Sequence, residues 1–328
     1  MNSYGSLFKV TLYGESHQPT IGVVLDGIPA GIQINLDQIK ADLELRKPKA
    51  IGTTPRKEED LFQITSGLFN GKTTGSPIHV MIENKNTKSK DYTHLKNHPR
   101  PGHADYVSEI KYHGYQDYRG GGRFSGRLTA ALVVAGSIAK MAIPFKISHK
   151  LIQVGSLKDM NKLDDYLKEI IRKKDSVGGI LQLKVSNMIV GLGEPFFNKL
   201  NAELAKLLFS IPAVKGVEFG LGFKGVETLG SQYNDVMINE NGQTKTNHQG
   251  GIAGGISNGN DLEINVFVKP TSSIQKVQET YHLKNKKIEP LDISGRHDVA
   301  IVRRVGIVLE SMLAIGLLDQ YLIYKAYK

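Results

Sequence analysis

Nine residues from Arg119 to Arg127 (RGGGRFSGR) combine three arginines with four glycines. Because glycine has no Cβ, its backbone N–H groups can approach a bound ligand closely. Ser125 is a good helix N-cap, and a helix N-terminus presents free N–H donors and partial positive charge. Guanidinium groups bind phosphate in bidentate geometry. The segment therefore predicts an anion site, with phosphate favoured, although a strand-to-helix loop with solvated arginines would have the same composition.

Two histidines stand beside predicted turns. His17 ends the segment GESH, directly after a predicted strand, and His103 lies in the segment RPGHAD, where a Pro-Gly turn leads into a predicted helix. A histidine in such a position can act as a general acid or base near neutral pH. Taken singly, His17 is better explained as a surface histidine in a turn, and the segment RPGHAD could also be an ordinary helix cap.

Two further segments near the C-terminus carry polar groups. Residues 269–273 (KPTSS) follow a predicted strand, and their cation and hydroxyls suit a phosphate or a polar ring edge, or simply a strand-ending turn. Residues 296–298 (RHD) precede the last predicted helix, which Asp298 would cap by default. Arg296 could hold an anion. Spacing alone does not join these segments into one site.

Two glycine motifs are weaker signals for nucleotide binding. Residues 220–225 (GLGFKG) match the dinucleotide-binding pattern, but the residues after them are a poor helix start. Residues 66–73 resemble a phosphate-binding P-loop, but Ser66 occupies the position of the first glycine. A strand rather than a helix is predicted after it. We therefore assign neither motif a function.

Composition limits the classes of protein to consider. The chain has 328 residues, of which 40% are apolar and 23% charged, which suits a globular protein with a full core. It contains no cysteine, so disulfides and thiolate metal sites are excluded, and we expect no metal centre. We also expect no signal peptide and no membrane span, because the longest apolar runs are too short or too polar. These features predict a soluble cytoplasmic protein.

The formal net charge of +10 favours anionic ligands. Nucleic acid is one such ligand, and salt-sensitive binding would be its mark. The lysines are spread along the chain, however, there is no tryptophan, and no nucleic-acid-binding motif is evident. A small phosphorylated ligand is the better expectation.

Strands and helices are mixed without a regular βαβ period, which favours an α+β fold of one domain spanning residues 1–328. Asn35 is expected to cap a helix, with Gln38 completing a capping box. Predicted strands cover residues 7–13, 21–25, 61–65, 78–82, 178–185, 217–223 and 262–268. Predicted helices cover residues 35–46, 104–113, 126–142, 158–174, 197–209 and 299–327.

Taken together, the motifs resemble those of the chorismate synthase family. The resemblance runs in order through residues 14–17, 100–105, 117–127, 191–195, 247–257, 269–273 and 295–298. It implies a β-α-β sandwich, with helices between antiparallel sheets, assembled as a homotetramer. It also implies 1,4-elimination of phosphate from 5-enolpyruvylshikimate 3-phosphate to give chorismate, in the shikimate pathway of aromatic amino acid biosynthesis. The resemblance further implies that the reaction needs reduced FMN, although it involves no net redox change. In some members of the family, NADPH reduces the flavin.

The resemblance also implies roles for individual residues. His17 would protonate the departing phosphate, His103 would protonate the reduced flavin or hold its protonation state, and Asp298 would relay a proton near flavin N5. Arg46 would meet substrate or NADP. Flavin contacts would come from Arg123, Phe124, Ser125, Pro212, Ala213, Gly254, Lys269, Pro270, Thr271, Ser272, Ser273 and Arg296.

The sequence departs from the family pattern in three places. Gln18 replaces the usual glycine after the histidine, and Phe124 stands where serine is usual. The arginine-rich stretch of the family is LRKPK at residues 45–49, where Lys47 or Lys49 could supply the missing charge. These departures motivate a second hypothesis, a protein that binds flavin but has lost or changed its activity.

Overall fold

Two antiparallel sheets form the outer layers of the molecule. The computed structural model describes residues 1–54, 59–85, 95–293 and 297–328. The first sheet has the order β1-β2-β3-β7-β4, and the second has the order β10-β13-β9-β8. The first comprises β1 (Ser3–Tyr4), β2 (Lys9–Gly14), β3 (Thr20–Asp26), β4 (Phe62–Ser66) and β7 (Ile78–Glu83). The second comprises β8 (Lys146–Val154), β9 (Gly179–Ser186), β10 (Val214–Phe219) and β13 (Leu262–Val268).

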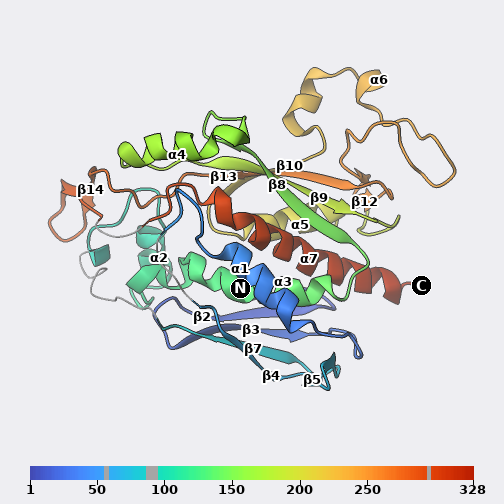
Figure 1. Ribbon diagram of the computed structural model, residues 1–328, viewed down its shortest axis with the longest axis horizontal. Helices are drawn as coiled ribbons and strands as arrows, with labels where there is room; N and C mark the ends of the chain where they lie inside the picture. Colours follow the sequence, from blue (N-terminus) through green and yellow to red (C-terminus); the bar gives the residue numbers. More distant parts are fainter. Residues whose placement is uncertain (55–58, 86–94, 294–296) are drawn as a thin grey trace.

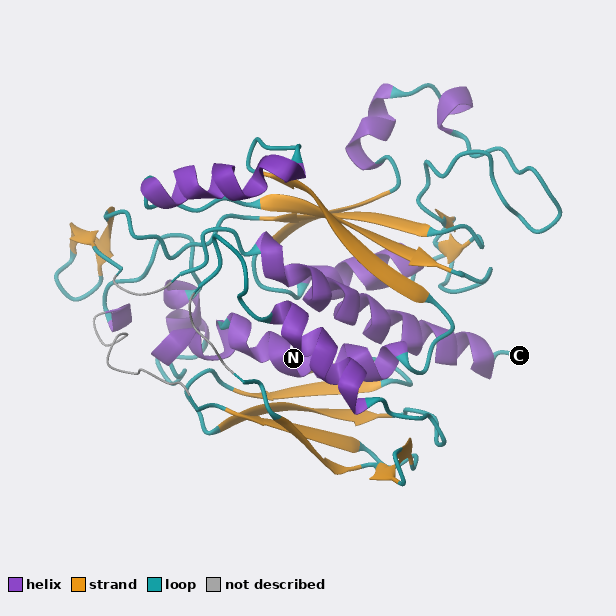
Figure 2. Ribbon diagram, viewed as in Figure 1, coloured by secondary structure: helices purple, strands orange, loops and turns teal. Residues whose placement is uncertain are grey.

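Helices fill the space between the two sheets, as Figures 1 and 2 show. The layer consists of α1 (Leu36–Arg46), α3 (Thr129–Lys140), α5 (Leu200–Phe209) and α7 (Val302–Ala326). The other helices are α2 (Asp105–Lys111), α4 (Leu163–Arg172) and α6 (Gly230–Tyr233). Small hairpins are formed by β5 (Leu68–Phe69) with β6 (Lys72–Thr73), β11 (Ile252–Ala253) with β12 (Ile256–Ser257), and β14 (Gln278–His282) with β15 (Lys287–Leu291). The expected α+β sandwich is confirmed.

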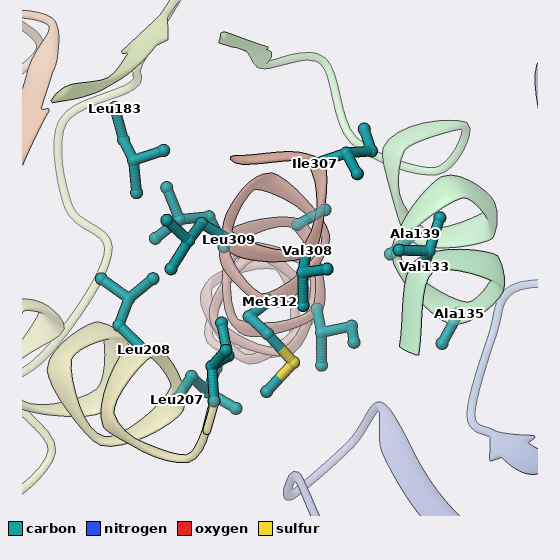
Figure 3. Packing of buried hydrophobic residues seen from close by; sticks show 14 of the residues in the cluster. Val133, Ala135, Ala139, Leu183, Leu207, Leu208, Ile307, Val308, Leu309 and Met312 are labelled. Carbon is teal, nitrogen blue, oxygen red and sulfur yellow. The ribbon is translucent and has the colours of Figure 1, made fainter. Parts of the chain in front are cut away.

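Helix α7 is the centre of the core. Its residues are buried on all sides from Val305 to Gln320. Figure 3 shows Val308, Leu309 and Met312 of α7 between side chains of α5 and α3. Among the described residues, α7 is long and apolar enough to cross a membrane, but 83% of its most apolar window is buried inside the protein. The expectation that this run is too short or too polar to cross a membrane was wrong on length and composition, and burial between two sheets explains its apolar character.

Most predicted elements are present, with shifted ends. Strand β13 has the predicted bounds because its residues alternate between buried and half-buried positions. The Asn35 side chain caps α1, but Gln38 donates to Asp42 instead of returning to the cap, so the expected capping box is absent. Strand β8 was not predicted. It lies at the edge of its sheet, where most residues stay partly exposed and show no clear apolar alternation.

Helices α3 and α7 pack so closely that one contact requires glycine. A Cβ atom added to Gly136 would lie 2.2 Å from the Cβ and 2.3 Å from the Cα of Ser311. Both residues are fully buried or nearly so, and the backbones face each other without an intervening side chain. The two helices would have to separate to admit even a methyl group.

We predict that Gly136→Ala lowers the free energy of unfolding by about 1–3 kcal/mol, because overpacking forces α3 away from α7. Gly230→Ala is the control, since no atom lies within 4 Å of the added Cβ. Urea unfolding of both variants measures the difference. Equal stability of Gly136→Ala and the wild type would contradict the close packing.

Candidate active site

A cleft of about 740 Å³ collects most of the residues expected to bind ligand. We call residues 119–127 the glycine loop. The cleft lies where this loop meets four other parts of the chain: the start of α2, the end of α5, the segment after β13 and the start of α7. Its lining includes Arg46, His103, Arg123, Phe124, Ser125, Pro212, Ala213, Lys269, Pro270, Thr271, Ser272, Ser273 and Asp298. Folding thus joins segments that sequence spacing alone could not join.

Three expected site residues are not in this lining. The ring of His17 lies directly behind Gly120, a lining residue: a Cβ added to that glycine would come within 2.1 Å of the imidazole Cε1. Gly254 lies in the β11–β12 turn. The carbonyl of its neighbour Gly255 accepts a hydrogen bond from Leu200 at the start of α5. Arg296 lies outside the described residues.

Within the described chain, Gly254 does not line this cleft, and its role as a flavin contact stays a prediction. The cleft is at the opposite end of α5, where Phe209 and Ser210 contribute to the lining. A helix of 10 residues separates the two ends by about 15 Å. Within the described chain, the β11–β12 turn and the cleft are therefore different places.

The glycine loop has a backbone that only glycine adopts easily. Gly120, Gly121 and Gly122 have φ values of 57°, 79° and 50°. Side chains at these positions would strain the backbone, and a Cβ at Gly122 would lie 2.1 Å from the carbonyl oxygen of Asp117. The Ser125 hydroxyl accepts a hydrogen bond from the Arg127 N–H (3.3 Å) and so caps the short helical turn before α3. The expected N-cap is confirmed, although α3 itself starts at Thr129.

A buried ion pair holds His103 at the mouth of the loop. The Arg100 guanidinium donates to both carboxylate oxygens of Asp105, at 2.8 Å each, and to the Ser273 hydroxyl at 3.2 Å. The His103 Nδ1 lies 2.6 Å from Asp105 Oδ1. Burial raises the pKa of Asp105, but hydrogen bonds from Arg100 and His103 outweigh it and hold the pKa well below its ordinary value of 3.8.

This geometry favours one tautomer of His103. The ionised Asp105 carboxylate can only accept, so its 2.6 Å contact favours a proton on Nδ1, and it is shorter than the 3.0 Å contact of the Arg100 guanidinium with the same nitrogen. The other ring nitrogen, Nε2, is then the one available to a ligand, and it lies close to the backbone of Gly121. A carboxylate that orients an imidazole in this way prepares it to exchange a proton at the free nitrogen.

Asp60 is a residue of the cleft lining that sequence reasoning missed. Its side chain is fully buried and forms ion pairs with Arg46 (2.6 Å) and with Arg127. Burial raises the pKa of Asp60, but the two guanidinium groups outweigh this effect and lower it. Its only sequence signal is an acidic residue beside Glu59, which is typical of a solvated stretch. The pairing fixes the expected site residue Arg46 in the cleft wall.

Asp298 does not cap the last helix, contrary to its default role. Helix α7 begins at Val302, and the Asp298 carboxylate accepts hydrogen bonds from the Thr54 N–H (2.9 Å) and from Arg304 (3.2 Å to each oxygen). Arg304 also donates to the carbonyl of Arg46 at 3.0 Å. Arg304, a residue that sequence reasoning missed, therefore ties Asp298 to the end of α1.

Positive charge dominates the lining. Arg123 makes no ion pair with any other described residue, and Lys215 has none either, whereas Asp60 and Asp298 are both engaged by arginines. The Lys269 ammonium donates to the Gly102 carbonyl and to the Ser272 hydroxyl. Burial lowers the pKa of Lys269, and the positive charge of nearby Lys215 lowers it further. A cleft with unneutralised cations is suited to a ligand with several negative groups.

Comparison with known proteins decides the family. The model of the family described as chorismate synthase matches residues 8–322. The chain belongs to the chorismate synthase family. A curated chorismate synthase of Chitinophaga pinensis is 51% identical over 97% of this chain and 96% of its own length. One of Methanocaldococcus jannaschii is 43% identical, again over 97% and 96%.

A solved chorismate synthase structure is similar over the whole fold. Its TM-score is 0.75 at 25% sequence identity, covering 98% of this chain and 93% of that one. Against the chorismate synthase pattern, the Gln18 side chain donates to Asp117 (3.1 Å), so its bulk lies against the glycine loop. Lys47 and Lys49 both pair with Glu44, so neither is a free replacement for a missing arginine.

We predict that Asp105→Asn lowers the free energy of unfolding at pH 7 by about 1–3 kcal/mol, because Arg100 loses its buried charged partner. A carboxyl whose pKa is lowered on folding stabilises the protein above its unfolded pKa, here about 3.8, and loses this contribution as the pH falls further. The difference from wild type should therefore shrink below about pH 3.8.

Urea unfolding between pH 3 and pH 7 measures this dependence. Asp165→Asn is the control, because Asp165 forms an exposed pair with Lys168 that contributes little. A stability difference for Asp105→Asn that is independent of pH would contradict the ion-pair assignment.

Proposed function

We propose that this protein catalyses the chorismate synthase reaction, the elimination of phosphate from 5-enolpyruvylshikimate 3-phosphate to give chorismate. This is a carbon–oxygen lyase reaction of the shikimate pathway. The observation that carries the proposal is the cleft in which Arg123, Lys215 and Lys269 stand beside His103 and Asp298. The substrate has one phosphate and two carboxylates, so it matches a cleft with surplus positive charge and few free acceptors.

The lining also fits reduced FMN, whose phosphate and flat ring need different partners. Lys269, Ser272 and Ser273 offer a cation and hydroxyls, and the buried Thr271 hydroxyl has no hydrogen-bond partner among the described residues. Phe124, which lies 6.4 Å from the Tyr112 ring, offers an aromatic surface in the same cleft. When bound, reduced FMN would supply an electron-rich ring that assists elimination without net oxidation.

The residues of this chain would divide the proton transfers among them. His17 would protonate the departing phosphate. Its ring lies immediately behind the cleft wall, in the space that a side chain at Gly120 would occupy. His103, with Nδ1 committed to Asp105, would exchange a proton at Nε2. Asp298, held by Arg304 and the Thr54 N–H, would relay the proton taken from the substrate ring.

Assembly and surroundings form the remaining part of the proposal. We infer a cytoplasmic homotetramer, and exposed apolar side chains support self-association. Phe223 and Val226, just before α6 in the sequence, are 81% and 85% exposed, and Met237, just after α6, is 66% exposed. Figure 1 shows α6 projecting away from the two sheets. NADPH is the reductant to test first for the flavin, in an aerobic assay with FMN.

An anaerobic assay tests the proposed function. The protein is mixed with reduced FMN and 5-enolpyruvylshikimate 3-phosphate, and chorismate is followed by its absorbance, with an active chorismate synthase as positive control. Product formation supports the proposal. Tight FMN binding without turnover would instead indicate a flavin-binding protein that has lost the activity, and absence of both would refute the assignment.

We predict that His17→Asn and His103→Asn each lower turnover at least about 100-fold, because each removes a nitrogen that exchanges protons. Asparagine at position 103 can still face Asp105 but lacks Nε2. The control is His113→Asn, which should leave turnover unchanged because His113 is exposed. Asparagine tolerates the positive φ of 53° at this position. Wild-type rates in both active-site variants, at unchanged melting temperature, would disprove these roles.

A further inference from the structure

The turn that carries His17 is held by groups from outside it. It joins β2 to β3, and the Gln18 N–H closes it with a hydrogen bond to the Glu15 carbonyl (3.2 Å). Ser16 and His17 are the two central residues of this β-turn, and both are buried. The backbone of a turn sets the direction of its central side chains, so whatever holds this turn also directs the His17 ring.

Asn84 makes three hydrogen bonds to this turn. It follows the last residue of β7, which pairs with β3, so Asn84 lies beside the start of that strand. Its side-chain Nδ2 donates to the carbonyls of Glu15 (3.0 Å) and Gln18 (2.7 Å), one on each side of the two central residues. Its backbone N–H donates to the carbonyl of Pro19 at 2.9 Å. A single amide group therefore spans the turn from one end to the other.

Arg127 determines the orientation of the Asn84 amide. The guanidinium Nε donates to Asn84 Oδ1 at 2.9 Å. A guanidinium only donates and a backbone carbonyl only accepts, so one arrangement of the amide nitrogen and oxygen satisfies both neighbours. Arg127 lines the cleft and pairs with Asp60, which also pairs with Arg46. Asn84 therefore links the His17 turn to the charged wall of the cleft.

We propose that Asn84 is a positioning residue for the reaction, which holds His17 at the cleft wall through the carbonyls of Glu15 and Gln18. The inference rests on the proposed function, in which His17 gives a proton to the departing phosphate. A donor displaced by about 1 Å can slow such a transfer up to about 100-fold. Asn84 does not line the described cleft, so its effect on turnover passes through the turn.

Two substitutions remove the donors of Asn84. Asn84→Asp keeps an oxygen for Arg127, but its carboxylate repels the carbonyls of Glu15 and Gln18. We expect turnover to fall about tenfold, with KM for 5-enolpyruvylshikimate 3-phosphate within about threefold of wild type, because the cations of the cleft are unchanged. Asn84→Leu has a similar shape and no charge, and it should lower turnover as well.

A double-mutant cycle tests whether the effect passes through His17. Turnover is measured for wild type, Asn84→Asp, His17→Asn and the double variant, after melting temperatures have shown that each is folded. Positioning predicts that Asn84→Asp changes the turnover of His17→Asn less than about twofold. A purely structural role would lower turnover equally on both backgrounds. If Asn84→Asp does not fold, Asn84→Leu takes its place in the cycle.

Asn260→Asp is the matched control. The Asn260 amide also donates to a backbone carbonyl, that of Gly242 (3.1 Å), and accepts from a donor, the Thr244 N–H (3.1 Å). Asn260 is not among the residues of the cleft lining. The turnover of this variant should stay within about twofold of wild type, because a lost amide donor remote from the His17 turn leaves the proton transfer intact.

Histidine NMR of the ligand-free protein is a readout that does not depend on activity. The ring signals of His17, assigned by their loss in His17→Asn, should shift in Asn84→Asp and stay unchanged in Asn260→Asp. If wild type has no turnover, the proposed function fails, and these signals alone decide the inference. If wild type is active, undiminished turnover of Asn84→Asp, or an equal fall on the His17→Asn background, would overturn the inference and leave the proposed function standing.

Discussion

Buried guanidinium groups need carboxylates, and this requirement organises the whole cleft. Moving a charge out of water is costly unless an opposite charge and hydrogen bonds accompany it. Asp60 pairs with Arg46 and Arg127, and so joins the end of α1 to the start of α3. Asp298 pairs with Arg304, and the same guanidinium group donates a hydrogen bond to the carbonyl of Arg46. The Asp60–Arg127 pair and the hydrogen bond from Arg304 to the Arg46 carbonyl join segments 67 and 258 residues apart, so these charged groups hold distant parts of the cleft wall together.

The glycine loop shows how much a sequence pattern can reveal and where it stops. Composition alone predicted a backbone able to approach an anion, and three consecutive positive φ values are consistent with that reading. The structure adds two reasons for glycine that no local pattern contains. Gly122 passes the carbonyl of Asp117, and Gly120 leaves room for the ring of His17. The contact at Gly122 lies within its own loop, whereas the contact at Gly120 depends on His17, from a segment brought in from elsewhere in the chain.

Local patterns predicted elements better than they predicted partners. Strand β13 and the Asn35 cap follow from alternation and side-chain chemistry within a few residues. Asp60 and Arg304 were missed because the residues next to them in the sequence do not indicate that either one forms an ion pair inside the protein. Gly254, a flavin contact by family resemblance, lies at the far end of α5 from the cleft, so its role stays a prediction that the fold of one chain does not test. The family assignment itself rested on the order of motifs, a property of the whole chain.

Charge and neutral polarity have different tasks in the cleft. Arg123 and Lys215 attract any ligand with negative groups, and a long-range attraction of this kind discriminates poorly between ligands of similar charge. Orientation requires short, directional bonds to groups with fixed geometry. His103 receives such geometry from Asp105, a carboxylate outside the cleft lining that lies 2.6 Å from Nδ1 of the imidazole. The orientation of this ring therefore determines where its opposite nitrogen, Nε2, is presented.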